Sequence, residues 1–210
     1  MRDHAHCGMS LYGSAGGRKY LNAAERRRFV RAARRAPPEV RLFCLVLGWS
    51  GGRISEVLAL TPAAIDIDSG VAIIQTLKRR KGGIVRQVPL PHDVLGELNH
   101  VFRIRRLQRE PDFATDRLWG WSRTTAWRRV KEVMAAASIT GTPAMPKGLR
   151  HGFGVTAFQA NVPPHLVQRW LGHASLRTTS IYGDVIGTDE RAFAARMWPK
   201  VSKWRGRRPT

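Results

Sequence analysis

The chain has 210 residues, and its 36 Lys and Arg against 15 Asp and Glu leave a formal net charge of +21. Such an excess of positive charge favours a polyanionic partner, with nucleic acid ahead of a membrane surface. A hydrophobic content of 43% is enough to bury a core, so the chain is not a disordered basic tail. No apolar run reaches the ~18 residues that cross a bilayer, and no signal peptide is visible. Cys7 and Cys44 offer no zinc spacing and no disulfide framework, which fits a reducing compartment.

The first expected helix follows a segment without periodicity. Residues 1–20 are rich in Gly, Ser and His, and we expect them to be a flexible lead. Asn22, with Glu25 three residues further on, predicts a capping box for a helix over 22–35, which two prolines end. The next helix is expected to turn four apolar side chains inward: Leu42, Leu45, Val46 and Trp49.

The only clear β signal lies in the middle of the chain. Two β-branched runs, 71–77 and 84–90, flank a basic turn with two glycines, which predicts an antiparallel hairpin with a charged tip. Because the rest of the chain carries helical patterns, the predicted fold class is mostly α with a small antiparallel β-hairpin or sheet. We expect one domain over 21–198 and a basic C-terminal tail over 199–210. The remaining helices are expected over 92–109, 123–137, 147–160, 164–171, 176–183 and 188–198, the second of them capped by Ser122.

Polar residues gather beside glycines or helix ends at four places, and the first two precede residue 82. After a pair of glycines, Arg53 at the start of a helix suits a phosphate, and Glu56 is close enough to support it. The hairpin tip carries Lys78 and Lys81, and a lysine there can donate a proton if its pKa is lowered. Taken alone, the first cluster also fits a helix cap and the second a solvated run of charge.

The other two clusters lie in the second half of the chain. Lys147 and Arg150 share one face near a helix start, which alone would equally fit a solvated helix face. A Gly-His pair ending at His173 is followed nine residues later by Tyr182, across two threonines. A single histidine or tyrosine is more often structural, but this spacing is uncommon by chance.

The order of these pieces resembles the catalytic domain of the tyrosine recombinases, the phage integrase family. Three stretches match family boxes, namely GGRISEVLALTP, PKGLRHGFG and LGHASLRTTSIYG. The resemblance implies an enzyme that cleaves and rejoins double-stranded DNA at specific sites through a 3′-phosphotyrosyl link, without a metal, another cofactor or ATP. It also implies self-assembly as a tetramer on DNA, and a cytoplasmic, nucleoid-associated location in a bacterium.

The resemblance also assigns roles to the matching residues. Arg53 and Arg150 would clamp the scissile phosphate, whose non-bridging oxygens gain charge in the transition state. Tyr182 would be the nucleophile, and His173 would hydrogen-bond the phosphate or the tyrosine. Glu56 would support the site.

The general acid of the resemblance is a hairpin lysine that protonates the leaving 5′-oxygen. Counting forward from Arg53 favours Lys78, whereas counting back from Pro89 favours Lys81. We prefer Lys78 and keep Lys81 as the alternative.

Two departures from the family pattern leave other functions open. Lys147 stands where the family usually has histidine; it can still donate to a phosphate, but as a base it would need a strongly depressed pKa. His151 is then expected to be a core or supporting residue. The N-terminal core-binding domain is expected to be absent, so the chain would be a minimal recombinase, a fragment, or one that relies on a helper protein for site recognition. The alternatives are a catalytically weak or silent DNA-binding relative and a type IB topoisomerase-like enzyme.

Overall fold

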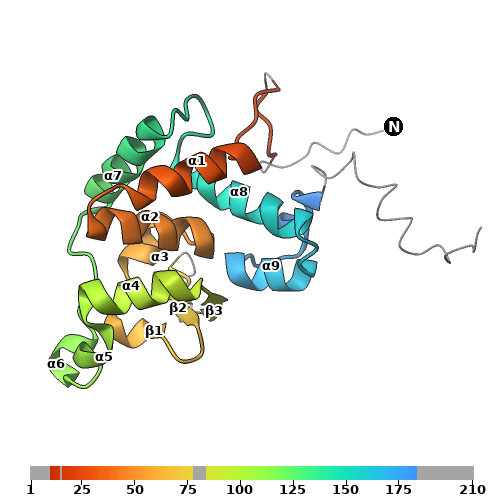
Figure 1. Cartoon of the computed structure of the whole chain (residues 1–210). Coiled ribbons are helices and arrows are strands. Elements are labelled where there is room, and N and C mark those ends of the chain that lie inside the picture. Colours follow the sequence, from red (N-terminus) through yellow and green to blue (C-terminus); the bar gives the residue numbers. More distant parts are fainter. Residues whose placement is uncertain (1–9, 15, 78–83, 184–210) are drawn as a thin grey trace, which may run out of the picture.

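The fold is described by a computed structural model over residues 10–14, 16–77 and 84–183 (Figure 1). Helices dominate these ranges and one small sheet lies beside them, so the predicted fold class is confirmed. In chain order the elements are α1 (Ala23–Arg34), α2 (Pro38–Ser50), α3 (Ile54–Leu58), a short 3-10 helix η1 (Pro62–Ala64), β1 (Ile65–Asp66), β2 (Val71–Gln75), β3 (Val85–Pro89), α4 (His92–Phe102), α5 (Ile104–Leu107), α6 (Pro111–Ala114), α7 (Arg123–Ala136), α8 (Pro146–Gln159), α9 (Pro164–Leu171) and α10 (Arg177–Ser180).

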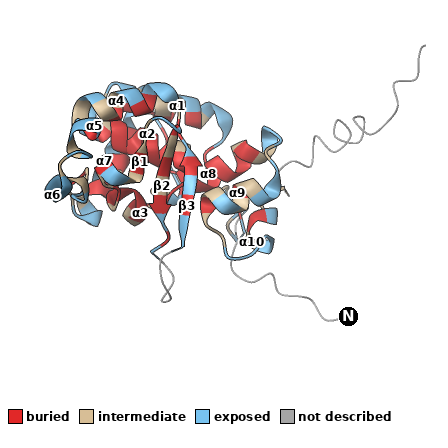
Figure 2. Cartoon of the chain, turned by 90° about the horizontal axis from the view of Figure 1, so that it is seen from below, coloured by how far each residue is buried: buried red, intermediate tan, exposed pale blue. Residues whose placement is uncertain are grey.

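Helix α2 lies at the centre of the main core. Every residue from Leu42 to Leu47 is buried, so no face of the helix meets solvent over this stretch. Helices α1, α4, α7 and α8 pack around it, and their inward faces are the buried ones (Figure 2). A helix that is apolar all round must be covered on every side. Helix α2 therefore determines where α8, the carrier of Arg150, lies.

Both helix starts that the sequence marks are confirmed. The side chain of Asn22 accepts a hydrogen bond from the backbone N–H of Glu25 (2.9 Å), and the Glu25 carboxylate accepts one from the N–H of Asn22 (2.9 Å). This reciprocal pair is the capping box that begins α1. At the start of α7, the Ser122 hydroxyl accepts from the N–H of Thr125 (3.1 Å).

The sheet has three antiparallel strands in the order β1-β2-β3. Ile73 pairs with Gln87, so the predicted hairpin is confirmed, while its turn, residues 78–83, lies outside the described residues. Strand β1 was not predicted, because two residues are too few to show a pattern. On β3, Arg86 and Val88 are buried and their neighbours on the strand are exposed. A charged residue thus occupies an inward position of the hairpin.

The described part of the expected flexible lead over 1–20 is packed against the domain. Tyr12 and Arg18 pair as an antiparallel bridge across a glycine-containing turn. Leu11 and Tyr20 are buried and belong to a second apolar cluster. Its other buried members are Phe153, Val155, Ala157, Val167, Leu171 and Tyr182. The glycine-rich composition of residues 1–20 gave no indication that Leu11 and Tyr20 are buried.

Other differences concern helix lengths. The helix expected over 92–109 is broken at Arg103, whose φ of +53° separates α4 from α5. The helix expected over 176–183 is reduced to α10, and the expected helix over 188–198 lies outside the described residues. Within the part of the chain that the structure describes, every helix is too short or too polar to cross a membrane.

Candidate active site

Three segments that are distant in the sequence meet around the side chain of Arg150. From α8, its Nη1 donates to the carbonyl of Gly51 (2.8 Å) and its Nη2 to the carbonyl of Leu171 (2.6 Å). Gly51 ends α2 with a φ of +61°, and a Cβ atom there would lie 2.6 Å from the ring of Phe153. Only glycine therefore lets the turn after α2 approach α8 so closely.

A buried carboxylate joins two arginines beside this turn. Oε1 of Glu56 accepts from Nη1 of Arg53 (2.7 Å), and its Oε2 accepts from the backbone N–H of Arg53 (2.9 Å) and from Nη2 of Arg86 (2.6 Å). Burial alone would raise the pKa of Glu56, but the charge of Arg86 and the hydrogen bonds from both arginines outweigh it and lower the pKa. Glu56 is therefore a charged carboxylate that holds Arg53 by backbone and side chain.

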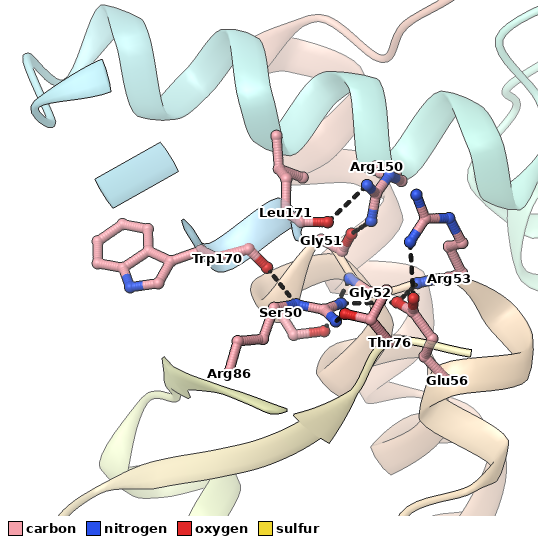
Figure 3. Close-up of polar contacts among 10 residues, drawn as sticks. All are labelled: Ser50, Gly51, Gly52, Arg53, Glu56, Thr76, Arg86, Arg150, Trp170 and Leu171. Carbon is pink, nitrogen blue, oxygen red and sulfur yellow. Dashed lines mark hydrogen bonds and ion pairs between the residues drawn. The ribbon is translucent and has the colours of Figure 1, made fainter. Parts of the chain in front are cut away.

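Arg86 is the second arginine of this group, and it was not among the predicted site residues. Its Nη1 donates to the Thr76 hydroxyl (2.9 Å) and its Nε to the carbonyl of Trp170 (2.7 Å), in addition to the bond with Glu56 (Figure 3). Its side chain is only 2% exposed. Arg86 thus connects β3 to α3, to the end of β2 and to the end of α9.

The two predicted phosphate-binding arginines differ in exposure. The side chain of Arg53 is 33% exposed, so its guanidinium is open to a ligand. Arg150 is buried. Its pKa is lowered to about 10, mainly by burial and secondly by the charge of Arg53. Arg150 therefore remains charged at neutral pH. Figure 3 shows their guanidinium groups near each other beside the 51–53 turn, which forms a compact positive centre.

Tyr182, the predicted nucleophile, is fully buried. Its ring lies on Gly154 of α8, where a Cβ atom would come within 2.6 Å of the tyrosine Cζ. Its hydroxyl lies 3.1 Å from Nδ1 of His151. Burial raises the pKa of Tyr182 to about 12, against the opposing charges of Arg150 and Arg53. The tyrosine is therefore protonated and covered in this structure.

His173 lies beside Tyr182, and the charges of Arg150 and Arg53 act on its ring. Its Nδ1 is hydrogen-bonded to the hydroxyl of Thr179 (2.9 Å), and its ring is nearly parallel to that of Tyr182, with the centroids 6.1 Å apart. Burial, then the charges of Arg150 and Arg53, lower the pKa of His173 to about 3. The imidazole is therefore neutral, with Nδ1 engaged by a threonine.

The remaining predicted residues fall into two groups. Lys147 is exposed on the first turn of α8, and its charge contributes, after burial, to a lowered pKa of about 4 for His151. His151 is thus buried and neutral, as expected for a core or supporting residue, but it also contacts the predicted nucleophile. Lys78 and Lys81 lie outside the described residues.

Sequence reasoning missed four residues of the site: Thr76, Arg86, Gly154 and Thr179. The sequence contained one signal for Arg86. It lies two residues before Val88 in a predicted strand, so both side chains point to the inward face of that strand. A glycine four residues after Arg150 was a weaker signal of a close approach to the helix. The threonines carry no signal until the fold brings them to their partners.

Comparison with known proteins identifies the class of this domain. The family model described as "Phage integrase family" matches residues 19–186, and the chain belongs to this family. The resemblance stated from the sequence is therefore confirmed.

Individual relatives narrow the comparison to tyrosine recombinases. The chain is 34% identical over 145 residues to the tyrosine recombinase XerA of Pyrococcus furiosus, which covers 68% of this chain and 49% of the relative. It is 32% identical over 161 residues to XerD of Pseudomonas aeruginosa, covering 74% of this chain and 52% of the relative. The chain thus spans about half the length of these curated relatives.

Solved structures show the same fold. A crystal structure of XerA recombinase superposes with a TM-score of 0.66 at 22% identity, covering 87% of this chain and 64% of the other. The XerH site-specific recombinase bound to difH substrate, in a pre-cleavage complex, gives a TM-score of 0.64 at 24% identity and covers 87% and 53%. The described domain has the fold of a tyrosine recombinase catalytic domain.

Proposed function

We propose that this chain is the catalytic part of a site-specific recombinase that cleaves and rejoins double-stranded DNA through a 3′-phosphotyrosyl intermediate, with no metal and no ATP. The observation that carries the proposal is the convergence of Arg53, Arg150, His173 and Tyr182, which come from four separate segments of the chain. The net charge of +21 supports a DNA partner, since cations spread over the surface bind the duplex backbone.

The phosphate is held by the two arginines. Arg53 offers its exposed guanidinium, while Glu56 fixes its direction. Each terminal nitrogen of Arg150 donates one N–H to a carbonyl, so three of the five N–H groups remain for the phosphate oxygens. Fixed guanidinium groups stabilise the negative charge that grows on the non-bridging oxygens in the transition state. His173 adds a hydrogen bond from its second ring nitrogen.

The chemical step exchanges one phosphodiester bond for another. The oxygen of Tyr182 bonds to phosphorus as its proton passes to water, and the bond to the 5′-oxygen breaks as that oxygen gains a proton. Lys78 supplies this second proton, with Lys81 as the alternative donor. The phosphotyrosyl bond keeps the energy of the phosphodiester, so the reverse attack by a 5′-hydroxyl rejoins the strand without ATP.

Catalysis also requires Tyr182 to move, because a fully buried hydroxyl does not meet a phosphate on duplex DNA. DNA binding therefore exposes the tyrosine in the proposed enzyme. The same burial, together with Lys147 in place of the usual histidine, favours a second candidate function. In that case the chain is a catalytically silent DNA-binding relative, and Tyr182 is a core residue.

The partners follow from the same proposal. One of the matched structures is described as a site-specific recombinase bound to its substrate. For this chain we propose a double-stranded DNA partner, self-assembly as a tetramer on it, and a helper protein for site recognition. The proposed location is the nucleoid of a bacterium.

The test begins with a random pool of DNA duplexes, from which the full chain selects the sequences it binds. These sequences are then rebuilt as suicide substrates with a nick beside the candidate cleavage position, so that cleavage releases a short fragment and cannot reverse. We expect a covalent protein–DNA adduct that survives denaturation and is absent with Tyr182→Phe. Binding without any adduct supports the silent relative. Relaxation of supercoiled plasmid without a selected site supports the topoisomerase-like alternative.

A further inference from the structure

Arg86 is buried, and each of its three guanidinium nitrogens donates a hydrogen bond. Its three nitrogens donate to Glu56 on α3 (2.6 Å), to Thr76 just after β2 (2.9 Å) and to the carbonyl of Trp170 on α9 (2.7 Å), as Figure 3 shows. These partners come from three elements other than its own strand. A planar fork with fixed donor directions suits such a junction better than a flexible ammonium group.

The first consequence is electrostatic. Glu56 lies between Arg53 and Arg86, and each arginine donates to one of its oxygens at 2.7 Å or less. If Arg53 were the only partner of this carboxylate, the pair would have no net charge. With Arg86 present, the group of three carries a net charge of +1, and the exposed member is Arg53. Arg86 therefore offsets the charge of Glu56, so that the group presents a net positive charge to a ligand at Arg53.

The second consequence is geometric. Arg86 binds the carbonyl of Trp170 and Arg150 binds that of Leu171, so two arginines hold consecutive carbonyls at the C-terminus of α9. These carbonyls lack partners within the helix and carry the negative end of its dipole. Gly172 follows with a φ of +65°, and a Cβ atom there would lie 3.1 Å from Nη1 of Arg86. The turn that carries His173 therefore packs directly against Arg86.

The third contact reaches the hairpin. The side chain of Thr76 binds Arg86, and its backbone N–H donates to the carbonyl of Ile84 (2.9 Å). Thr76 and Ile84 therefore form the base of the β2–β3 connection, and Arg86 ties that base to the same centre.

We propose that Arg86 is a positioning residue for DNA cleavage. It offsets the charge of Glu56 and holds that carboxylate in the position that directs Arg53, and it fixes the turn that carries His173, so that both residues meet one phosphate. The inference rests on the proposed function, because it concerns the same site. It differs from a purely structural ion pair, which would contribute to folding and affect cleavage only through the amount of folded protein.

The experiment compares Arg86→Met and Arg86→Lys with the wild type on a selected suicide substrate. Arg34→Met is the matched control, since Arg34 forms an ion pair with Asp93 on an exposed surface. The melting temperature, the Kd for duplex DNA and the cleavage rate constant at saturating DNA are measured for each. We expect Arg86→Met to lower the rate constant about 10- to 100-fold with less than about a threefold change in Kd. Arg86→Lys keeps the charge and regains part of the rate, and the control cleaves like the wild type.

A second substrate separates positioning from folding. A methylphosphonate at the scissile position lacks one negative charge, so its cleavage depends less on the charge of Arg53. The deficit of Arg86→Met should therefore be several-fold smaller on this substrate, whereas a structural defect lowers both rates by the same factor. The proposal is overturned if the two deficits are equal, or if folded Arg86→Met cleaves at the wild-type rate. Should Arg86→Met fail to fold, the same comparison is made with Arg86→Lys. A wild-type chain that forms no adduct contradicts the proposed function itself, which is a distinct result.

Discussion

The hydroxyl of Tyr182 and Nδ1 of His151 lie 3.1 Å apart, in a part of the domain from which solvent is excluded. His151 directly follows Arg150 on α8, so the same helix holds one of the two arginines proposed to bind phosphate and the partner of the predicted nucleophile. Burial is the main cause that lowers the pKa of His151 to about 4, and the charges of Lys147 and Arg150 lower it further. The ring is therefore a neutral partner for the hydroxyl at physiological pH. In this structure the tyrosine is therefore stored beside the site where it is proposed to act.

The pH dependence of stability tests the environment of His151. Its folded pKa of about 4 lies below the ordinary value of 6.5, so below pH 6.5 the unfolded chain takes up a proton that the folded chain refuses. Its contribution to the free energy of unfolding is complete above pH 6.5 and decreases by up to about 1.4 kcal/mol per pH unit as the pH falls toward 4. Denaturant titrations between pH 7 and 5 should show this slope added to that of His173, whose pKa is lowered to about 3, and His151→Gln should remove the contribution of His151. His100→Gln, at an exposed position of α4, serves as the control, and an unchanged slope in His151→Gln contradicts the assignment.

A second prediction concerns the packing of the stored tyrosine. Gly154→Ala places a methyl group within 2.6 Å of Cζ of Tyr182, so the ring must leave its position or strain α8. We expect a loss of about 1–3 kcal/mol in the free energy of unfolding and a Tyr182 pKa that falls from about 12 toward 10. Spectroscopic titration of tyrosine measures the second effect.

Gly96→Ala is the matched control for this substitution. It lies on the exposed side of α4 with no atom within 4 Å of the added methyl group. We expect it to gain roughly 0.5–1 kcal/mol from helix propensity alone. If Gly154→Ala behaves like this control, the tyrosine does not occupy the described position.

The two arginines should be separable by stability. Arg53→Ala and Arg150→Ala are both expected to abolish cleavage while most nonspecific DNA binding remains, because many other cations share that binding. Arg150→Ala also leaves the carbonyls of Gly51 and Leu171 without a donor, which costs about 1–3 kcal/mol of stability. Arg53→Ala takes the side-chain donor from the buried Oε1 of Glu56, but Arg86 and the backbone N–H of residue 53 still pair that carboxylate, so we expect a smaller loss. A large loss of nonspecific DNA binding in either variant would contradict this division of roles, in which the two arginines serve cleavage and the other cations bind the duplex.

Much of this arrangement could be predicted from the sequence, and the exceptions have physical causes. Capping residues and β-branched runs act locally, so the start of α1 and the β2–β3 hairpin follow from short stretches. The partners of Arg86 are 10, 30 and 84 residues away in the sequence, and no local pattern contains such contacts. The burial of Tyr182 likewise depends on Gly154, whose role appears only when α8 and the end of the domain come together.

The hairpin lysines can be told apart by a leaving group that needs no proton. Replacing Lys78 or Lys81 should block cleavage of ordinary DNA only for the residue that is the general acid. A substrate with a bridging 5′-sulfur departs without protonation, so it should restore cleavage in that variant and in no other. We expect rescue of Lys78→Ala. Rescue of Lys81→Ala in its place would transfer the role to Lys81, and rescue of neither would remove the hairpin from the mechanism.

In the proposed mechanism, Tyr182 becomes covalently joined to DNA. Digesting the covalent adduct with protease and nuclease, and sequencing the modified peptide by mass spectrometry, identifies the attached residue directly. We predict a nucleotide linked through its 3′-phosphate to Tyr182, and a free 5′-hydroxyl at the cleaved end of the released strand. A nucleotide on any other residue, or a link through a 5′-phosphate that leaves a 3′-hydroxyl at the cleaved end, would contradict this mechanism.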